Sequence, residues 1–284
     1  MEKLKELIEQ LKQEVAQIQI QGRELTPEEI ARVEAIQKCL PLLQQAITVL
    51  RAEPAENLIT YKIVSDEDGK LKRCARIACN FWNRFIIPKS SIVIRLSIFT
   101  SAGTTIARAY KPYENNGIVY GVVEFNTKYL SQFKDNEISG TIIHEIGHTL
   151  GFGWDAWTSL FDSGTGIFTR AAIAVIRALQ DMLVETEYGP GTRYSHWDEE
   201  KFNKELMTGF KDKGEHVLPV TIAVMKLLGH SINEELLEKT DLNTLMDALA
   251  QVVFSRQTEA KALNLDHFEE TEIWENIPHD EQLT

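Results

Sequence analysis

The sequence predicts an α+β fold, in which strand-forming segments are grouped in one part of the chain and helical segments form the rest. Residues 58–126 hold several β-branched, partly alternating segments, whereas apolar residues at helical spacing dominate residues 1–52 and much of the chain after residue 134. The 284 residues suffice for one large domain or two modest ones. Hydrophobic residues at 43% and charged residues at 25% are ordinary for folded proteins and exclude wholesale disorder.

The charge and the cysteine content exclude several classes of protein. A net charge of −12 argues against a nucleic-acid groove or an anionic membrane surface as the main partner. No apolar run approaches the roughly 18 residues that a membrane span needs, and three cysteines cannot form a disulfide framework. Because the first residues are charged and show no signal peptide, we expect a soluble protein made in a reducing compartment, either cytoplasmic or exported by a route that needs no signal peptide.

Residues 1–52 are predicted to form a helical hairpin within an N-terminal extension of residues 1–56. Apolar residues recur at alternating spacings of four and three in its first helix: Leu4, Ile8, Leu11, Val15 and Ile18. Thr26 and Glu29 can form a capping box at the start of the second helix, which Pro41 is expected to bend. The pattern favours a packing hairpin. A pro-segment and a coiled coil that binds a protein partner stay open as alternatives.

The strands of the predicted fold lie in the next part of the chain. Segments rich in β-branched and aromatic residues predict strands over residues 58–64, 91–99, 104–110 and 117–126. A turn around Asn116 separates the last two, and residues 74–85 have helical spacing. The acidic turn at 65–69 is too short for a calcium loop and is interpreted as a solvated turn.

The second half of the chain is predicted to be mostly helical. Helices are expected over residues 135–150, from about 169 to 187, and over 218–228, and residues 231–284 are interpreted as an acidic helical tail. The predicted domains are therefore an extension of residues 1–56, a domain of residues 57–230, and the tail.

The strongest chemical signal is His144-Glu145-Ile146-Gly147-His148, on the helix predicted for residues 135–150. Residues four apart face the same way on a helix, so His144 and His148 can both direct a ring nitrogen to one zinc ion at about 2.0–2.1 Å. Glu145 projects about 100° round the helix, beside the metal, where a carboxylate can take a proton from an attacking water. This pattern indicates a zinc peptidase.

The residues after this motif resemble the metzincin zinc-binding signature, in which a glycine at the position of Gly151 turns the chain so that a third histidine reaches the metal. The usual place of that histidine holds Trp154, which cannot bind zinc. Residues 195–198, with His196, and residues 205–209, with Met207, instead resemble the leishmanolysin branch of the metzincins, in which an insertion precedes the third histidine. The resemblance covers about residues 75–230.

The resemblance implies a zinc endopeptidase that acts on protein or peptide substrates. It makes His144, His148 and His196 the ligands of one catalytic Zn²⁺, Glu145 the general base and Met207 the residue of a methionine turn under the metal. It also implies a twisted mixed sheet with the active-site helix above a cleft, and a mostly helical lower half. Residues 117–126 would be the edge strand that pairs with substrate. Phe210 stands where some metzincins have a zinc-directed tyrosine, so no tyrosine switch is expected.

Two other interpretations of the site stay open. Glu185 or Glu187, on the helix predicted for 169–187, could supply the third ligand of a different metallopeptidase geometry. The protein could also be a binding protein that keeps a zinc site while its helical ends bind partners. Cys74 loosely resembles the thiol that blocks zinc in latent metzincins, but buried free cysteines are the favoured interpretation of Cys39, Cys74 and Cys79.

Overall fold

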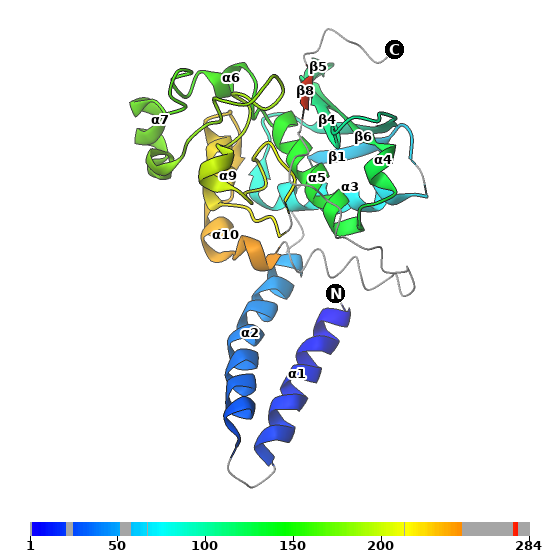
Figure 1. Ribbon diagram of the computed structural model, residues 1–284, viewed down its shortest axis with the longest axis vertical. Coiled ribbons are helices and arrows are strands. Elements are labelled where there is room, and N and C mark those ends of the chain that lie inside the picture. Colours follow the sequence, from blue (N-terminus) through cyan, green and yellow to red (C-terminus); the bar gives the residue numbers. More distant parts are fainter. Residues whose placement is uncertain are drawn as a thin grey trace. The chain divides into compact units, whose positions relative to one another are not determined.

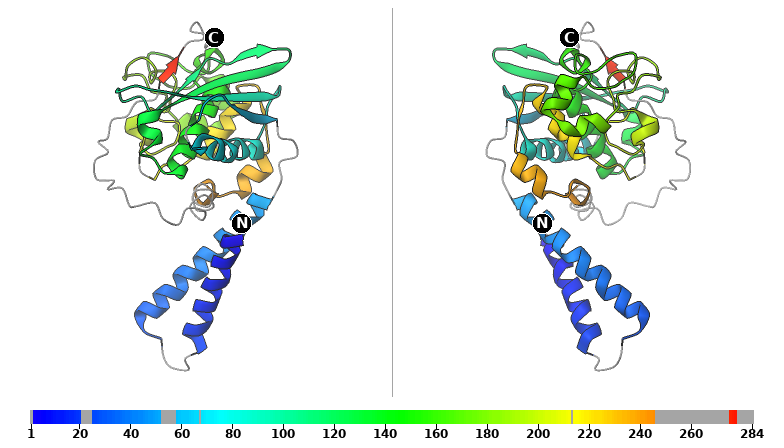
Figure 2. Two further views of the ribbon diagram at one scale, coloured as in Figure 1. Left: turned by 90° about the vertical axis from the view of Figure 1, so that its right-hand side faces the viewer. Right: turned by 90° about the vertical axis from the view of Figure 1, so that its left-hand side faces the viewer.

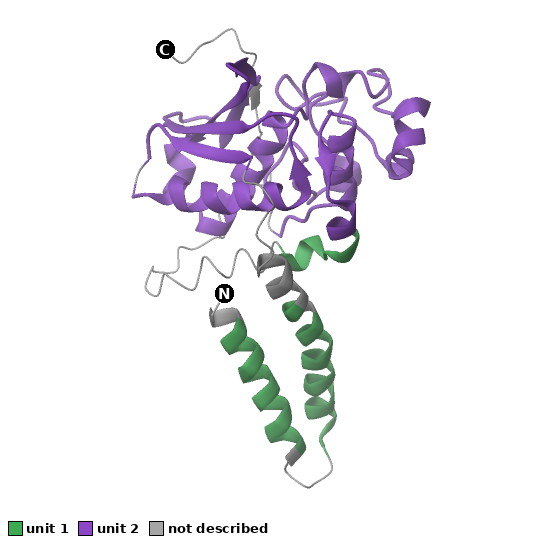
Figure 3. Ribbon diagram, turned by 180° about the vertical axis from the view of Figure 1, so that it is seen from behind, with its two compact units in different colours: residues 1–53, 238–260 green, residues 54–237, 261–284 purple. Residues whose placement is uncertain are grey.

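The computed structural model describes residues 2–20, 25–51, 58–66, 68–212, 214–245 and 275–277. The chain divides into two compact units (Figure 3). Unit 1 comprises residues 1–53 and 238–260, and unit 2 comprises residues 54–237 and 261–284.

Unit 1 contains the two helices predicted for the N-terminal hairpin, α1 (Glu2–Ile20) and α2 (Pro27–Arg51). The apolar stripe of α1 is used inside the hairpin, since buried Ile8 packs against Leu7, Leu40 and Leu43. The capping box is present: the backbone N–H of Glu29 donates to the Thr26 hydroxyl, and the backbone N–H of Thr26 donates to the Glu29 carboxylate. Helix α2 continues through Pro41.

Unit 2 is built on a twisted mixed sheet, as the sequence predicted (Figure 1). The strands lie in the order β1 (Ile59–Ile63), β3 (Ile92–Phe99), β6 (Ile118–Asn126), β4 (Ala107–Tyr110) and β8 (Glu275–Ile277), and β5 (Tyr113–Asn115) pairs with β6 on the side of β4. Strands β1, β3 and β6 are parallel to one another, and β4 and β5 run antiparallel to β6. The four strands predicted between residues 58 and 126 are thus confirmed.

The prediction that residues 117–126 form the edge strand is wrong. Strand β6 lies inside the sheet, because β3 pairs along one side of it while β4 and β5 pair along the other. The turn at Asn116 and Gly117 folds β5 back onto β6, which closes the side that was expected to stay free. Whether a strand is at an edge depends on long-range pairing, which the alternation of its side chains does not reveal.

Two helices cover one face of the sheet, as both side views in Figure 2 show. Helix α3 (Lys70–Phe85) carries a buried face that includes Cys74, Phe81 and Trp82, and helix α5 (Asp135–Thr149) is buried along almost its whole length. The indole N–H of Trp82 donates to the carbonyl of Ile143 at 2.9 Å, so α3 holds α5 in place by a buried hydrogen bond. A short helix, α4 (Thr127–Leu130), joins β6 to the loop before α5.

The prediction of a mostly helical lower half is wrong, because the region after α5 contains short helices joined by long loops. These elements are α6 (Asp155–Thr158), α7 (Arg170–Val175), η1 (Arg177–Asp181), α8 (Glu199–Phe202), α9 (Pro219–Ala223) and η2 (Val224–Lys226). The last two account for the helix predicted over 218–228.

The prediction of one long helix from 169 to 187 is wrong. Helix α7 ends at Val175, the backbone at Ile176 is extended, and only the 3₁₀ helix η1 follows. Residues 184 and 185 leave the helical path to make distant backbone hydrogen bonds: Val184 N–H donates to Gly166 O and Glu185 N–H to His196 O, each at 3.0 Å. These tertiary bonds outweigh the local helical preference, which the β-branched residues of this segment already weaken.

Only part of the predicted C-terminal tail lies within the described residues. Helix α10 (Glu234–Lys239) agrees with the expected helical character, whereas β7 (Ser231–Ile232), which pairs with β2 (Ile86–Ile87), and β8 were not expected there. Residues 246–274 and 278–284 lie outside the described part of the chain. None of the described helices is long and apolar enough to cross a membrane.

Candidate metal centre

Helix α5 presents two histidines side by side near its C-terminal end. Because His144 and His148 are one helical turn apart, their rings lie on the same face, and their Nε2 atoms are 2.9 Å from each other. Both side chains are fully buried.

The third histidine, His196, comes from a loop 48 residues beyond His148. Its neighbour Trp197 forms isolated bridges to Val184 on one side and to Thr208 on the other, so the segment is held between two other loops. Its Nε2 lies 3.2 Å from the Nε2 atoms of both His144 and His148. In the part of the chain that the structure describes, these histidines are the one cluster of three or more potential metal ligands.

The Nδ1 atoms of all three rings face backbone carbonyl oxygens. His144 Nδ1 lies 2.6 Å from Leu206 O, His148 Nδ1 lies 3.0 Å from Phe152 O, and His196 Nδ1 lies 3.0 Å from Thr192 O. A carbonyl can only accept, so each Nδ1 carries the ring proton and each Nε2 of a neutral ring presents a lone pair. Burial lowers the pKa of all three rings, that of His148 to about 4, which favours the neutral form.

This arrangement fits a zinc ion. Three lone pairs converge with no proton between them, an unfavourable arrangement unless a cation binds there. Two nitrogens bound to one tetrahedral zinc at about 2.0–2.1 Å are about 3.3 Å apart, close to the separations of 2.9 to 3.2 Å between these atoms. Neutral imidazoles whose other nitrogen donates to a carbonyl are the usual histidine ligands of zinc.

Glu145, the predicted base, lies on α5 directly after His144 and is fully buried. Neither of its carboxylate oxygens has a hydrogen-bond partner among the described residues. Burial raises the pKa of this carboxyl well above its ordinary value. A buried carboxyl without partners is costly, and such groups in proteins are commonly bonded to water or a ligand.

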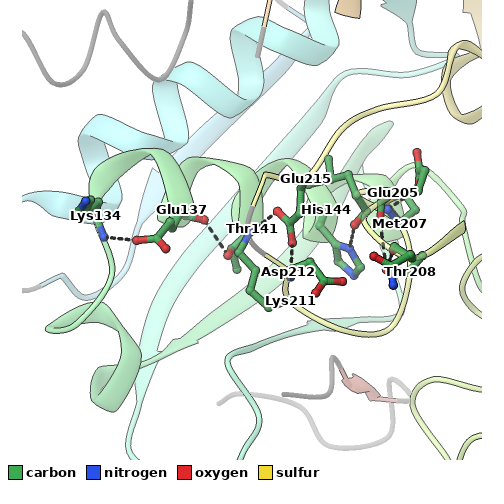
Figure 4. Close-up of polar contacts among 12 residues, drawn as sticks. Lys134, Glu137, Thr141, His144, Glu205, Met207, Thr208, Lys211, Asp212 and Glu215 are labelled. Carbon is green, nitrogen blue, oxygen red and sulfur yellow. Dashed lines mark hydrogen bonds and ion pairs between the residues drawn. The ribbon is translucent and has the colours of Figure 1, made fainter. Parts of the chain in front are cut away.

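Met207 belongs to a turn of residues 205–208, here called the Met-turn, which packs against α5 beside His144 (Figure 4). Its side chain is fully buried. A Cβ atom added to Gly147 would lie 2.9 Å from both Sδ and Cε of Met207, closer than side chains normally approach. The glycine inside the zinc motif therefore makes room for the methionine.

Gly151 ends helix α5 in the way that the sequence predicted. Its φ of 116° is strained for any residue with a Cβ, and its N–H donates to His148 O. Trp154, the residue in the usual place of a third histidine, donates its indole N–H to the same carbonyl at 2.8 Å. Nearby, Nε2 of His230 lies 2.7 Å from Leu150 O.

The other candidates for metal chemistry lie outside the three-histidine cluster. The Glu185 carboxylate accepts from the backbone N–H of Glu187 at 2.7 Å and holds a turn. Burial raises the pKa of Cys74 to about 12, and its thiol donates to Asp135 O, so it is an inert buried thiol as predicted. Cys79 is also buried, but Cys39 is exposed, contrary to expectation.

Sequence reasoning did not identify the groups that orient the histidines. Three of them are backbone carbonyls, which no motif reveals. Sequence reasoning also did not single out Glu205, a fully buried carboxylate in the same turn as Met207, whose Oε2 accepts from the backbone N–H of Met207 at 2.6 Å. The signal that the sequence offered for Glu205 was an acidic residue two positions before Met207.

The comparisons with known proteins agree with this site. Residues 89–234, just over half of the chain, match the family model for leishmanolysin. No curated protein matches the sequence. The matched region contains the three clustered histidines, Glu145 and Met207, and it agrees with the resemblance drawn from the motifs. The chain therefore belongs to the leishmanolysin family of metallopeptidases.

Proposed function

We propose that the protein is a zinc-dependent endopeptidase of the metzincin class that hydrolyses peptide bonds in protein or peptide substrates. One observation carries the proposal: the Nε2 lone pairs of His144, His148 and His196 converge, because each Nδ1 donates to a carbonyl. Three protein ligands with an open fourth position are the pattern of catalytic zinc sites, whereas structural sites have four protein ligands. Family membership supports the same reaction class.

The three histidines hold the ion in this proposal, and their Nδ1 hydrogen bonds keep the rings in the orientation that binding requires. When bound, zinc supplies a Lewis acid that acidifies a water molecule and polarises the scissile carbonyl. Glu145 acts as general base: it takes the proton from the attacking water and delivers it to the leaving amine. Its two oxygens are buried and have no partner among the described residues, so neither is committed to another group there.

Two further features support the metzincin assignment. Gly151 turns the chain at the end of α5, and Met207 packs against Gly147 inside the zinc motif. We assign catalysis to residues 57–230, since every residue named for the site lies in unit 2. Residues 1–56 and 231–284 are then extensions, whose helices are available to bind a protein partner.

Cleavage of a diverse peptide library by the purified full-length protein tests the proposal. We expect cleavage that stops with a chelator and returns when zinc is added, and none by Glu145→Gln. Absence of cleavage by zinc-loaded protein, or cleavage that neither the chelator nor Glu145→Gln affects, would refute the proposed function and favour a binding protein.

A further inference from the structure

Glu205 is a buried carboxylate with hydrogen-bond partners on both oxygens. Only 1% of the residue is exposed. Oε2 accepts from the backbone N–H of Met207 at 2.6 Å, while Oε1 accepts from the backbone N–H of Leu218 at 3.1 Å and from the hydroxyl of Thr221 at 2.6 Å. Burying a carboxylate is unfavourable unless such partners compensate for the lost water, so this side chain serves a specific local arrangement.

The first connection runs from Glu205 to His144. The Met-turn lies outside the helices and strands, so it depends on side chains and distant backbone bonds for its shape. By binding the N–H of Met207, the carboxylate closes the turn around Leu206. The carbonyl of Leu206 faces His144 Nδ1 at 2.6 Å. The position of this carbonyl determines both the tautomer and the orientation of the His144 ring.

The second connection runs from Glu205 to the loop that carries His196. The Thr221 hydroxyl donates its single proton to Glu205 and accepts from the indole N–H of Trp197 at 2.9 Å. The backbone N–H of Trp197 donates to Met207 O at 2.9 Å. Trp197 directly follows His196, so the same carboxylate also fixes the segment of the third histidine.

We propose that Glu205 is a positioning residue for the metal centre, which sets the ring orientation of His144 through Leu206 and the placement of His196 through Thr221 and Trp197. One buried group thereby couples two ligands that come from different parts of the chain. The inference rests on the proposed function insofar as these ligands hold zinc. A purely structural role would instead affect folding stability without changing metal affinity.

Zinc affinity and the visible spectrum of the cobalt-substituted protein test the inference in the full-length chain. Glu205→Gln keeps the size of the side chain but places an amide N–H₂ against one set of donors. We expect zinc binding, measured by competition with a chromophoric chelator, to weaken about 10–100-fold, as is usual when a group behind a ligand is lost. The cobalt absorption bands should change as well, since they report ligand geometry.

One control variant and one further pair of variants complete the test. Glu124→Gln changes another buried carboxylate, bonded to Arg108 and Tyr110 in the sheet, and should lower stability without changing zinc affinity or the cobalt spectrum. Thr221→Val removes the hydroxyl between Glu205 and Trp197 at nearly constant volume and should weaken zinc binding. Thr221→Ser keeps the hydroxyl and should bind zinc as tightly as the wild type. Thr221→Val also decides the question if Glu205→Gln does not fold.

A readout without metal separates this inference from the proposed function. In zinc-free wild type and Thr221→Ser, the hydrogen-bonded Nδ1–H of His144 should give a protected ¹H–¹⁵N signal, which Glu205→Gln should lose. Loss of stability with wild-type zinc affinity, cobalt spectrum and His144 signal in both Glu205→Gln and Thr221→Val would overturn the inference. Failure of the wild type to bind zinc would refute the proposed function, and the His144 signal would still decide the role of Glu205.

Discussion

The Nδ1 atom of His144 lies 2.6 Å from the carbonyl oxygen of Leu206, although 62 residues separate them in the sequence. This contact fixes the proton on Nδ1 and leaves the Nε2 lone pair directed at the other two histidines. The orientation of the His144 ring on α5 therefore depends on the Met-turn that packs against this helix.

The third ligand is tested by His196→Ala, which should lose tightly bound zinc and peptidase activity together. Two imidazoles alone make a weak zinc site, and Nε2 of His196 lies 3.2 Å from both other Nε2 atoms. Glu187→Ala is the matched control and should keep both properties. Glu185→Ala should also keep zinc but be less stable, since its carboxylate holds a turn. Full zinc in His196→Ala, with loss in either glutamate variant, would contradict the metzincin assignment.

The general base is tested by Glu145→Gln, which should keep zinc and fold but lose hydrolysis. An amide cannot accept the proton of the attacking water, and general bases contribute about 10²–10⁴-fold to rates. Steady-state kinetics on zinc-loaded protein measure the loss in kcat. Near-normal kcat with full metal content would exclude Glu145 from this role.

The contact between Gly147 and Met207 predicts the effect of a single methyl group. Gly147→Ala places a Cβ 2.9 Å from Met207 Sδ and Cε, and such overpacking should lower the free energy of unfolding by about 1–3 kcal/mol. Adding Met207→Ala should recover part of this loss, because the second change frees the space. Gly140→Ala, on the same helix, is the control: its Cβ would meet neighbours only at 3.5 Å or more, so stability should be kept or raised. Equal effects of the two alanines on the free energy of unfolding, measured with denaturant, would show that the close approach of Gly147 and Met207 does not limit stability.

The burial of Glu205 predicts a pH dependence of stability. Burial raises the pKa of its carboxyl to about 7, against the lowering effect of the hydrogen bonds from Thr221, Met207 and Leu218, and the nearby Glu215 carboxylate adds to the rise. Between the unfolded pKa of about 4.5 and the folded pKa of about 7, the folded state holds the extra proton, so this group stabilises the fold less as pH rises. The maximal slope for one proton is about 1.4 kcal/mol per pH unit.

The difference in unfolding free energy between wild type and Glu205→Gln isolates this contribution, because the buried histidines titrate in both proteins. Measured on zinc-free protein, the unfolding free energy of the wild type minus that of Glu205→Gln should decrease as pH rises from about 4.5 to about 7. A difference that is constant or increases over this range would show that the carboxyl is ionised in the folded state throughout.

The N-terminal hairpin is tested by deleting residues 1–52. If the hairpin only packs, the deletion should lower stability, because unit 1 loses most of its residues, without raising kcat/KM per folded molecule. The use of Ile8, Leu40 and Leu43 inside the hairpin supports this interpretation. A large gain in kcat/KM on deletion would instead identify residues 1–52 as a latency segment.

The sequence by itself determined the features that depend on local periodicity. Residues four apart share a face of any α-helix, so His144 and His148 were certain to lie together once α5 formed, and Gly151 could end the helix because it tolerates a positive φ. The strands and the hairpin helices also followed from side-chain patterns that adjacent residues establish.

Only the tertiary structure decided the features that depend on distant pairing. Residues 117–126 lie inside the sheet because β4 and β5 occupy the side that the alternation pattern left undefined. The segment predicted as a helix up to residue 187 is not helical at its end, because backbone N–H groups there donate to Gly166 O and His196 O. His196 reaches the other histidines, and Glu205 reaches Met207 and Thr221, through loops whose course is fixed by buried hydrogen bonds rather than by local propensity, and such bonds form only where the whole fold brings donor and acceptor together.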